Sequence, residues 1–353
     1  MVEKQVKTWF RRSLFQWNLK KNDRKMPWKG VKDPYKIWLS EVMLQQTRVE
    51  QGMGYYSRFL ERFPTVDILA KSPDNQVFKL WEGLGYYSRC RNLIATAQKV
   101  SFELGGRFPN SREGLLSLKG VGPYTAAAIG SFAFGLPLAV VDGNVFRVLA
   151  RIFGIHEPID QPKGKKMLES LAQELLDEKN PAIYNQAIMD FGAVVCKPQQ
   201  PLCKGCPFQK KCIANQQSFQ AVLPRKSKKT KIRNRYMYYL QLESKGKQLV
   251  RERAGKDIWQ GLFEFILLEH DEPLEDRYLY TLSHWGIKTT KLKKEMLGLS
   301  EEIVHQLSHQ KIHCRILRIN IDQQIDLEGY QWKSKTAIRQ LPFPRLITRY
   351  LGW

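Results

Sequence analysis

The spacing of hydrophobic residues divides the chain into a helical N-terminal part and a C-terminal part rich in strands. Apolar side chains recur at helical spacing over residues 4–20, with Lys and Arg between them, which predicts an amphipathic packing helix. The same spacing predicts helices over 163–180 and 181–195. Segments 236–242 and 314–319 instead carry the β-branched and aromatic residues that are typical of strands.

Proline and its neighbours mark two further helix starts. Asp33 precedes Pro34, and an acidic N-cap followed by proline in the first turn is typical of a helix N-terminus. We expect that helix to run through residues 35–51. The second start is Pro123, which follows the turn 120–122 (Gly-Val-Gly) and precedes a run of small residues that allows close packing against a neighbour.

Glycines in this second turn indicate a possible anion site. Gly120 and Gly122 can adopt backbone angles that are closed to other residues, and the free amides of the helix that follows can hold a phosphate. By itself, Gly-x-Gly before a helix is more often an ordinary tight turn.

The charge balance indicates a polyanionic partner. The 353 residues, enough for two or three domains, include 57 Lys plus Arg against 34 Asp plus Glu, a formal charge of +23. Nucleic acid comes first among polyanions; a well-solvated basic protein or one that binds an anionic membrane surface is the alternative. The sequence shows no apolar run of membrane-spanning length and no signal peptide, so we expect a cytoplasmic, nucleoid-associated location.

The cysteines predict a metal centre. Four of the six fall within 17 residues in the pattern C-x6-C-x2-C-x5-C, and such a cluster in a reducing compartment is typical of metal binding. Four thiolates suit either tetrahedral zinc or a [4Fe–4S] cluster. Zinc sites usually contain two C-x2-C steps, whereas this chain has one. The four cysteines are Cys196, Cys203, Cys206 and Cys212.

Two acids stand out as candidates for catalysis. Glu41 lies in a strongly apolar stretch, where it either faces solvent on the polar side of its helix or occupies an apolar pocket. Desolvation in such a pocket favours the protonated carboxyl that a general acid requires. The second is Asp142, in the segment Val-Asp-Gly-Asn at 141–144.

The segment 81–93 (WEGLGYYSRCRNL) offers side chains for insertion into a base stack. Gly83 and Gly85 flank Leu84, and Tyr86 follows. Bulky side chains on a flexible turn beside arginines suit a wedge in DNA; a helix–helix turn with core tyrosines is equally consistent.

Together these motifs identify a family. The segments SEVMLQQT (40–47), WEGLGYYSR (81–89) and VDGN (141–144), the Gly-Val-Gly-Pro turn and the cysteine spacing resemble the endonuclease III superfamily of DNA glycosylases, and VDGN resembles its adenine DNA glycosylase (MutY-type) branch. Segment 259–265 resembles the GLWEF-like motif of that branch's C-terminal domain. The resemblance covers residues 5–215 strongly and 230–353 more loosely.

The resemblance implies a multidomain fold. Residues 1–215 would form an all-α helix-hairpin-helix glycosylase region with a [4Fe–4S] cluster held by the four cysteines. Within it, a six-helix-barrel module would span about 23–135, and a cluster module would combine 1–22 with 136–215. A basic linker over 216–232 would precede an α+β MutT (Nudix)-like domain at 233–353. That domain carries no Nudix-box acid cluster, so pyrophosphate hydrolysis is not predicted.

The resemblance also assigns roles to residues. Glu41 would be the general acid and Asp142 would stabilise the sugar cation, with support from Tyr124 and Asn144. Residues implied in binding the adenine, the duplex or the opposing lesion are Arg24, Trp28 and Gln186; Gln46, Leu84, Tyr86, Gly120 and Gly122; and Ser308 and His309. Leu307 stands where the family has an aromatic residue beside that Ser-His pair.

Tyr124 decides the expected reaction. Endonuclease III has a lysine at this position, which can form a Schiff base and cleave the strand, whereas tyrosine cannot. We therefore expect a monomeric, monofunctional enzyme that removes adenine paired with 8-oxoguanine or guanine in double-stranded DNA and leaves an abasic site. The alternatives are a bifunctional endonuclease III-type pyrimidine glycosylase, a non-catalytic Fe–S DNA-binding protein and a zinc-ribbon nucleic-acid module.

Overall fold

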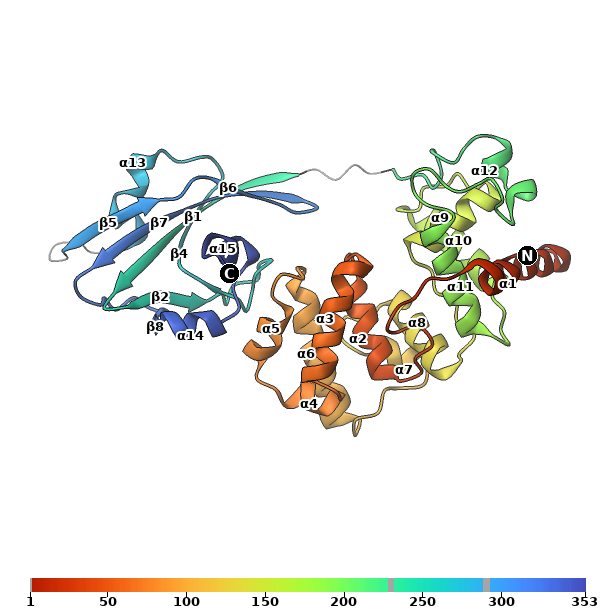
Figure 1. Ribbon diagram of the computed structural model, residues 1–353, viewed down its shortest axis with the longest axis horizontal. Coiled ribbons are helices and arrows are strands. Elements are labelled where there is room, and N and C mark those ends of the chain that lie inside the picture. Colours follow the sequence, from red (N-terminus) through yellow and green to blue (C-terminus); the bar gives the residue numbers. More distant parts are fainter. Residues whose placement is uncertain (1, 228–231, 288–292) are drawn as a thin grey trace. The chain divides into compact units, whose positions relative to one another are not determined.

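The computed structural model of the chain describes residues 2–227, 232–287 and 293–353. They group into two compact units, one of Met1–Lys71 with Asn92–Lys229 and one of Ser72–Arg91 with Thr230–Trp353 (Figure 1). Segment 72–91, with its glycine-rich turn, therefore groups with the C-terminal part of the chain, which the sequence does not indicate. Residues 228–231 of the expected linker lie outside the described part.

The first unit is helical. Helix α6 (Tyr87–Gln98) crosses the boundary between the units, and α5 (Asp74–Trp81) belongs to the second. The helices of the first unit are α1 (Lys4–Lys21), α2 (Pro34–Leu44), α3 (Val49–Arg62), α4 (Val66–Lys71), α7 (Arg112–Leu116), α8 (Pro123–Phe134), α9 (Gly143–Phe153), α10 (Pro162–Leu175), α11 (Pro181–Val194) and α12 (Ile213–Gln216), with the short turns η1 (Lys99–Glu103) and η2 (Gln209–Lys211).

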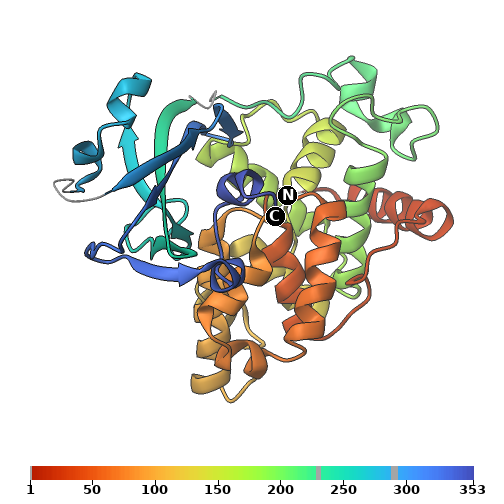
Figure 2. The same ribbon diagram turned by 60° about the vertical axis from the view of Figure 1, so that its left-hand side comes forward.

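Distant segments build one core of this unit. The predicted N-terminal helix α1 buries Phe10, Leu14 and Trp17 against apolar residues of α9, α10 and α11. Figures 1 and 2 show α1 beside α11 although more than half of the first unit separates them in sequence. Helix α2 packs instead on α3 and α8.

Helix α2 begins as predicted and ends earlier. The Asp33 side chain accepts hydrogen bonds from the backbone N–H of Tyr35 and Lys36, and Pro34 occupies the first turn. The expected continuation to residue 51 is wrong, because the chain leaves the helix after Leu44 and reverses direction. Gln46 adopts a φ of 56°, and α3 starts only at Val49.

The glycine turn before α8 confirms one expectation and corrects another. Gly120 has a φ of 77°, and a Cβ there would lie 2.7 Å from the Cβ of Asn92, so both conformation and space favour glycine. Gly122 instead has an extended φ of −90°. Its open surroundings, with no atom within 4 Å of an added Cβ, leave the backbone accessible. Pro123 occupies the first turn of α8, as predicted.

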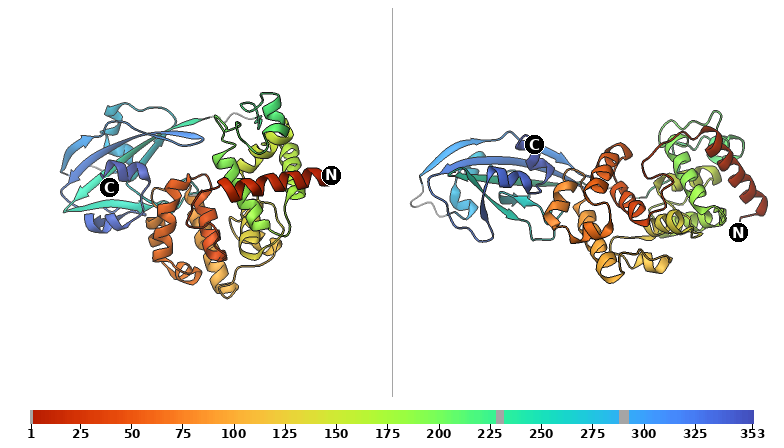
Figure 3. Two further views of the ribbon diagram at one scale, coloured as in Figure 1. Left: turned by 45° about the vertical axis from the view of Figure 1, so that its right-hand side comes forward. Right: turned by 60° about the horizontal axis from the view of Figure 1, so that its bottom comes forward.

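The second unit contains a mixed sheet around two long strands. β1 and β7 run parallel and side by side, with Tyr239 opposite Ile316 (Figure 3). β2 and β4 pair with β1, β5 and β6 pair with β7, and β3 and β8 pair with β2. The strands are β1 (Arg233–Ser244), β2 (Lys247–Glu252), β3 (Phe263–Glu264), β4 (Ile266–His270), β5 (Lys294–Leu299), β6 (Ile303–Gln306), β7 (Gln310–Ile321) and β8 (Gln331–Ser334).

Short helices complete the apolar layers of the second unit. Alternate residues of β1, such as Leu240 and Leu242, pack with residues of α13 (Asp276–Leu279) and η3 (Leu282–Trp285). Helices α14 (Lys335–Gln340) and α15 (Arg345–Tyr350) supply the buried Ile338, Leu346 and Ile347. The predicted strands at 236–242 and 314–319 are thus confirmed. None of the helices in the described ranges is long and apolar enough to cross a membrane.

Candidate active site

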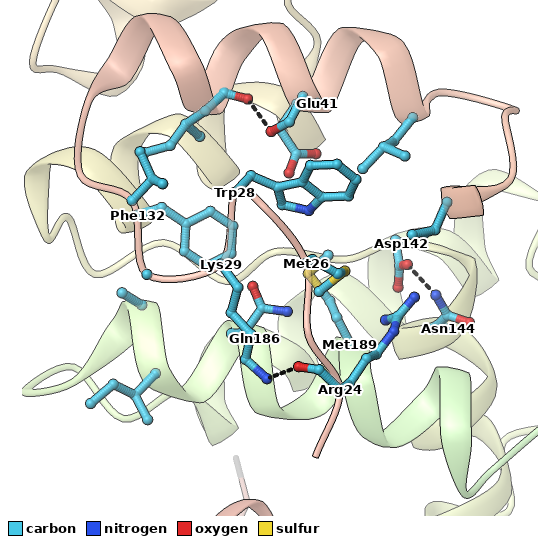
Figure 4. A pocket seen from close by; sticks show the side chains of 18 of the residues that line it. Arg24, Met26, Trp28, Lys29, Glu41, Phe132, Asp142, Asn144, Gln186 and Met189 are labelled. Carbon is cyan, nitrogen blue, oxygen red and sulfur yellow. Dashed lines mark hydrogen bonds between the residues drawn. The ribbon is translucent and has the colours of Figure 1, made fainter. Parts of the chain in front are cut away.

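A cavity of about 480 Å³ opens in the first unit (Figure 4). It is lined by parts of α1, α2, α8, α9 and α11 and by the segments before and after α2. All seven residues predicted for catalysis and adenine binding line it: Arg24, Trp28, Glu41, Tyr124, Asp142, Asn144 and Gln186. Met26, Lys29, Phe132, Ile183 and Met189 also line it and were not predicted.

Glu41 occupies the apolar pocket and not a polar helix face. It is 4% exposed on α2, and burial raises its pKa to about 7, although a side-chain hydrogen bond with Tyr124 opposes the rise and the charge of Asp142 adds to it. Within the described part of the chain, Glu41 Oε2 has no hydrogen-bond partner. A protonated carboxyl with a free oxygen facing a cavity is suited to donate a proton.

Asp142 is buried in a different environment. It is the N-cap of α9, and its Oδ1 accepts a hydrogen bond from the Val145 N–H at 2.8 Å while Oδ2 accepts one from Asn144 Nδ2 at 2.6 Å. Burial raises the pKa of Asp142, and these hydrogen bonds and the charge of Arg147 oppose that rise. Because donors surround both oxygens, the site favours the ionised form here more than at Glu41.

Tyr124, at the start of α8, stays neutral. Burial and the neighbouring carboxylates raise its pKa well above the ordinary value. A neutral phenol can donate a hydrogen bond to Glu41 but carries no nucleophilic amine.

Arg147 holds in place the N-terminal end of α9, where Asp142 and Asn144 lie. Its guanidinium donates to Asn144 Oδ1 and to the Gly192 carbonyl, each at 2.8 Å, and to the Cys196 carbonyl at 2.7 Å. A Cβ on Gly192 would lie 2.6 Å from the Asn144 Cβ, so α11 packs on α9 without space for a side chain. Sequence reasoning missed Arg147, although an arginine between Val145 and Val148 on a largely buried helix face is a signal for it.

The loop between α1 and α2 is fastened to α11 through one acid that the sequence analysis missed. Asp190 is fully buried and accepts from Arg24 Nη1 and Lys29 Nζ, both at 2.9 Å, and from Asn22 Nδ2 and Gln186 Nε2, both at 3.0 Å. An acid between Met189 and Phe191, in an otherwise apolar stretch of the helix, was the available signal.

The three residues expected to enter the duplex differ in their exposure to solvent. Gln46 is exposed on the turn after α2. Tyr86, in the second unit, is 41% exposed with a φ of 49°, whereas its neighbour Leu84 is 5% exposed. The structure therefore does not present Leu84 at the surface as a wedge, because it packs inward at the turn where its N–H bonds to the Trp81 carbonyl.

The expected lesion-reading residues lie in the second unit. Ser308 and His309 are exposed at the tip of the hairpin formed by β6 and β7, and Ser308 Oγ lies 3.1 Å from His309 Nδ1. Leu307 is half-buried, and its N–H bonds to the Gln310 carbonyl, which closes the hairpin.

The four clustered cysteines surround one small cavity after α11. All four are free thiols that line it together. Across the described ranges, no three His, Cys, Asp or Glu side chains are arranged to hold a single metal ion. Four thiols around a shared space are a donor set that both tetrahedral zinc and a [4Fe–4S] cluster use. Arg151 contacts this space, with Nη1 3.5 Å from Cys196 Sγ and 2.7 Å from the Lys197 carbonyl.

The fold and this site define a helix-hairpin-helix DNA glycosylase of base excision repair. Residues 39–178 match the HhH-GPD superfamily of base excision DNA repair proteins, and 237–353 match a NUDIX domain. A thermostable thymine-DNA glycosylase is similar at 30% identity, with a TM-score of 0.56 over 60% of this chain and 98% of that one. The trapped endonuclease III–DNA covalent intermediate shares the fold, at 22% identity and a TM-score of 0.54 over 62% of this chain and 100% of that one.

Curated relatives specify the family. Adenine DNA glycosylases from Buchnera aphidicola subsp. Baizongia pistaciae and from Rattus norvegicus are 34% and 35% identical, over 96% and 94% of this chain and 93% and 75% of theirs. The Homo sapiens enzyme is 34% identical over 93% of this chain and 70% of its own. The chain belongs to the adenine DNA glycosylase family. The predicted fold class and enzyme class are confirmed.

Burial of Glu41 predicts a pH-dependent stability cost. Because its folded pKa of about 7 lies above the ordinary 4.5, the folded state binds the proton more tightly, and stability is lost as the pH rises from about 4.5 through about 7. Glu41→Gln has no charge to desolvate. We expect it to unfold at a higher temperature than the wild type at about pH 8, by the equivalent of roughly 3 kcal/mol, and to differ little at about pH 4.5.

Thermal unfolding followed by circular dichroism across this pH range tests that expectation. Glu61→Gln, which removes one negative charge from an exposed position, is the control for net charge. A Glu41→Gln difference that is the same at both ends of the range would contradict a protonated buried carboxyl.

Proposed function

We propose that this adenine DNA glycosylase is monofunctional and hydrolyses the N-glycosidic bond of adenine opposite 8-oxoguanine or guanine in double-stranded DNA, leaving an abasic site. The observation that carries the proposal is the pair of carboxyl groups in one cavity, Glu41 with a raised pKa and a free oxygen and Asp142 with donors on both oxygens. Such an asymmetric pair divides acid and ionic roles in glycoside hydrolysis.

The base must first leave the duplex. Extruding a nucleotide costs a few kcal/mol, and less at a mispair. Gln46, in the first unit, is exposed on a turn with a positive φ, and we propose that it helps to fill the vacated space. Tyr86, in the second unit, is exposed in the same way and is the second candidate for this role. Leu84 would join them only after leaving its buried position.

In the cavity, Glu41 would act twice. Adenine is a poor leaving group as an anion, so the protonated Glu41 donates its proton to the base, most plausibly at N7, as the C1′–N9 bond breaks. The resulting glutamate then accepts a proton from the water that adds to C1′. This sequence returns Glu41 to its protonated form and accounts for every proton.

Asp142 would stabilise the sugar. Cleavage of the bond develops oxocarbenium charge, which the ionised Asp142 offsets directly or traps as a covalent acetal that water later opens. Asn144 and Arg147 keep this carboxylate oriented through the 2.6 Å and 2.8 Å hydrogen bonds.

Tyr124 is the reason that we propose no strand cleavage. A Schiff base with the sugar aldehyde requires a primary amine, and Tyr124 presents a neutral phenol next to Glu41. Lys29 also lines the cavity, but its amine is paired with the buried Asp190.

The four cysteines would hold a [4Fe–4S] cluster. Their shared cavity and their C-x6-C-x2-C-x5-C spacing support this assignment, and such a cluster, when bound, supplies a rigid covalent framework for the loop. The chain's own Lys197, Lys204, Lys210 and Lys211 would then be held on a fixed loop from which they can contact phosphates.

The hairpin tip of the second unit would read the opposing base. Ser308 and His309 are exposed there and can hydrogen-bond to a purine edge. Leu307 offers a half-buried aliphatic contact in place of an aromatic ring.

We expect alkali-dependent cleavage at adenine. The anaerobically purified protein, in excess, is incubated with duplexes that place adenine opposite 8-oxoguanine, guanine or thymine, and single-turnover products are resolved with and without alkali. Excision fastest opposite 8-oxoguanine, slower opposite guanine and absent opposite thymine supports the proposal. Strand cleavage without alkali at the same rate as base release would overturn monofunctionality, and equal rates on all three duplexes would overturn the preference for the mispair.

A second expectation separates chemistry from binding. Asp142→Asn keeps the size of the side chain and its position at the helix start but removes the negative charge. We expect duplex affinity within about threefold of wild type and loss of excision by more than about a thousandfold, since a charge that acts on the transition state contributes several kcal/mol. Gel-shift titration and single-turnover kinetics measure the two. Parallel losses of affinity and rate would indicate a structural role.

A third expectation is the pH dependence of the rate. Because Glu41 must carry a proton and its pKa is about 7, the single-turnover rate should be highest below that pH and fall about tenfold for each pH unit well above it. A rate that stays constant to about pH 9 would exclude Glu41 as the acid in the limiting step.

A further inference from the structure

One buried carboxylate in the first unit accepts hydrogen bonds on both oxygens and does not belong to the proposed catalytic pair, Glu41 and Asp142. Asp190, on α11, is 0% exposed and accepts four hydrogen bonds, two on each oxygen. Arg24 Nη1 and Gln186 Nε2 donate to Oδ1, whereas Lys29 Nζ and Asn22 Nδ2 donate to Oδ2. Three of these partners, Arg24, Lys29 and Gln186, line the cavity (Figure 4).

The hydrogen bond between Gln186 and Asp190 fixes the orientation of the Gln186 side-chain amide. A carboxylate is an acceptor only, so the end of the Gln186 amide that faces Asp190 at 3.0 Å must be the NH₂ group. The opposite end, Oε1, is then turned away from Asp190. Gln186 is half-buried on the cavity wall, and none of the residues in the described ranges donates a hydrogen bond to this oxygen.

An acceptor on the pocket wall selects among purines. Adenine carries an exocyclic amine at C6, which donates a hydrogen bond to an oxygen such as Gln186 Oε1. Hypoxanthine carries an oxygen at the same position, which would face Oε1 with no hydrogen between them. A buried polar atom that loses its hydrogen-bond partner is destabilised, because it has given up water without a replacement. A site built to pair with an amine therefore rejects the carbonyl analogue.

We propose that Asp190 is a positioning residue that sets base specificity by holding Gln186 with its oxygen toward the base. This inference rests on the proposed function, because it assumes that the extruded adenine enters this cavity. The contacts of Asp190 with Arg24 and Lys29 have a separate effect: they hold the loop between α1 and α2 on α11.

A ratio of two excision rates separates the effect of Asp190 on base specificity from its effect on the loop between α1 and α2. Single-turnover excision is measured on duplexes that hold adenine or hypoxanthine opposite 8-oxoguanine, and the adenine-to-hypoxanthine rate ratio is compared between variants, so that differences between the two base pairs cancel. Asp190→Asn replaces the carboxylate by an amide, which can both donate and accept hydrogen bonds. The Gln186 side-chain amide is then free to rotate into the opposite orientation. Gln186→Leu removes the reading oxygen. Asp23→Asn, an exposed acid in the loop between α1 and α2, is the matched control.

We expect Gln186→Leu and Asp190→Asn each to lower the ratio about tenfold or more, and the double variant to lower it no further than Gln186→Leu alone, because Asp190 acts on the ratio through Gln186. Because it also releases the loop between α1 and α2, Asp190→Asn should slow the excision of both bases, whereas Asp23→Asn should leave the ratio at the wild-type value. Additive losses of the ratio in the double variant, or a wild-type ratio in Asp190→Asn, would overturn the inference.

Two further readouts keep the result decisive. If Asp190→Asn does not fold, judged by circular dichroism, Gln186→Leu alone still tests the reading oxygen, and an unchanged ratio there overturns the inference. Wild-type excision of adenine is recorded in the same experiment. Its absence would contradict the proposed function, whereas adenine excision with an unaltered ratio in the variants contradicts only the role of Asp190.

Discussion

The structure of the active site depends on placing two carboxyl groups in one cavity with unequal hydrogen bonding. Burial raises the pKa of both Glu41 and Asp142, and hydrogen-bond donors on both oxygens oppose that rise at Asp142. Glu41 has apolar neighbours, one hydrogen bond with Tyr124 and a free oxygen, whereas Asp142 sits at a helix start with donors on both oxygens. The helices on which these acids lie must therefore be fixed to each other with little tolerance, since a small shift would admit water or remove a donor.

That requirement explains the polar contacts behind the catalytic residues. Arg147 joins Asn144 to the backbone carbonyls at Gly192 and Cys196, and Gly192 has no room for a side chain against Asn144. Buried networks of this kind are rigid only when every donor is satisfied. Hydrogen bonds of Arg147 thus connect the loop that carries the cysteines to Asn144, which orients Asp142. The ordering of the loop and the ordering of Asn144 are therefore coupled.

Much of this could be predicted from the sequence, and the failures have a common cause. Two local signals, the Asp33-Pro34 helix start and the Gly120 turn, are encoded by neighbouring residues and were read correctly. The four clustered cysteines do line one cavity, and the cluster that their spacing predicts stays a prediction. The helix expected over 35–51 was wrong because the polar run Gln45–Arg48 adopts a turn that helical spacing does not reveal. Asp190, Arg147 and Lys29 escaped notice because their partners lie far away in sequence; Arg24 and Asp190 are 166 residues apart. Leu84 was placed at the surface from its motif, whereas packing buries it.

Helix α11 brings these separate requirements together. One of its faces closes the core with Tyr184, Ile188 and Phe191, and another carries Gln186 and Asp190 along the cavity. Its C-terminal end leads directly into Cys196. Because the loop between α1 and α2 is anchored to a charged group on this helix, a basic loop can form a wall of the cavity without a large hydrophobic surface. The cost of burying Asp190 is offset by its two cationic partners, and the directional bonds around it give the pocket a defined polarity that apolar packing alone cannot provide.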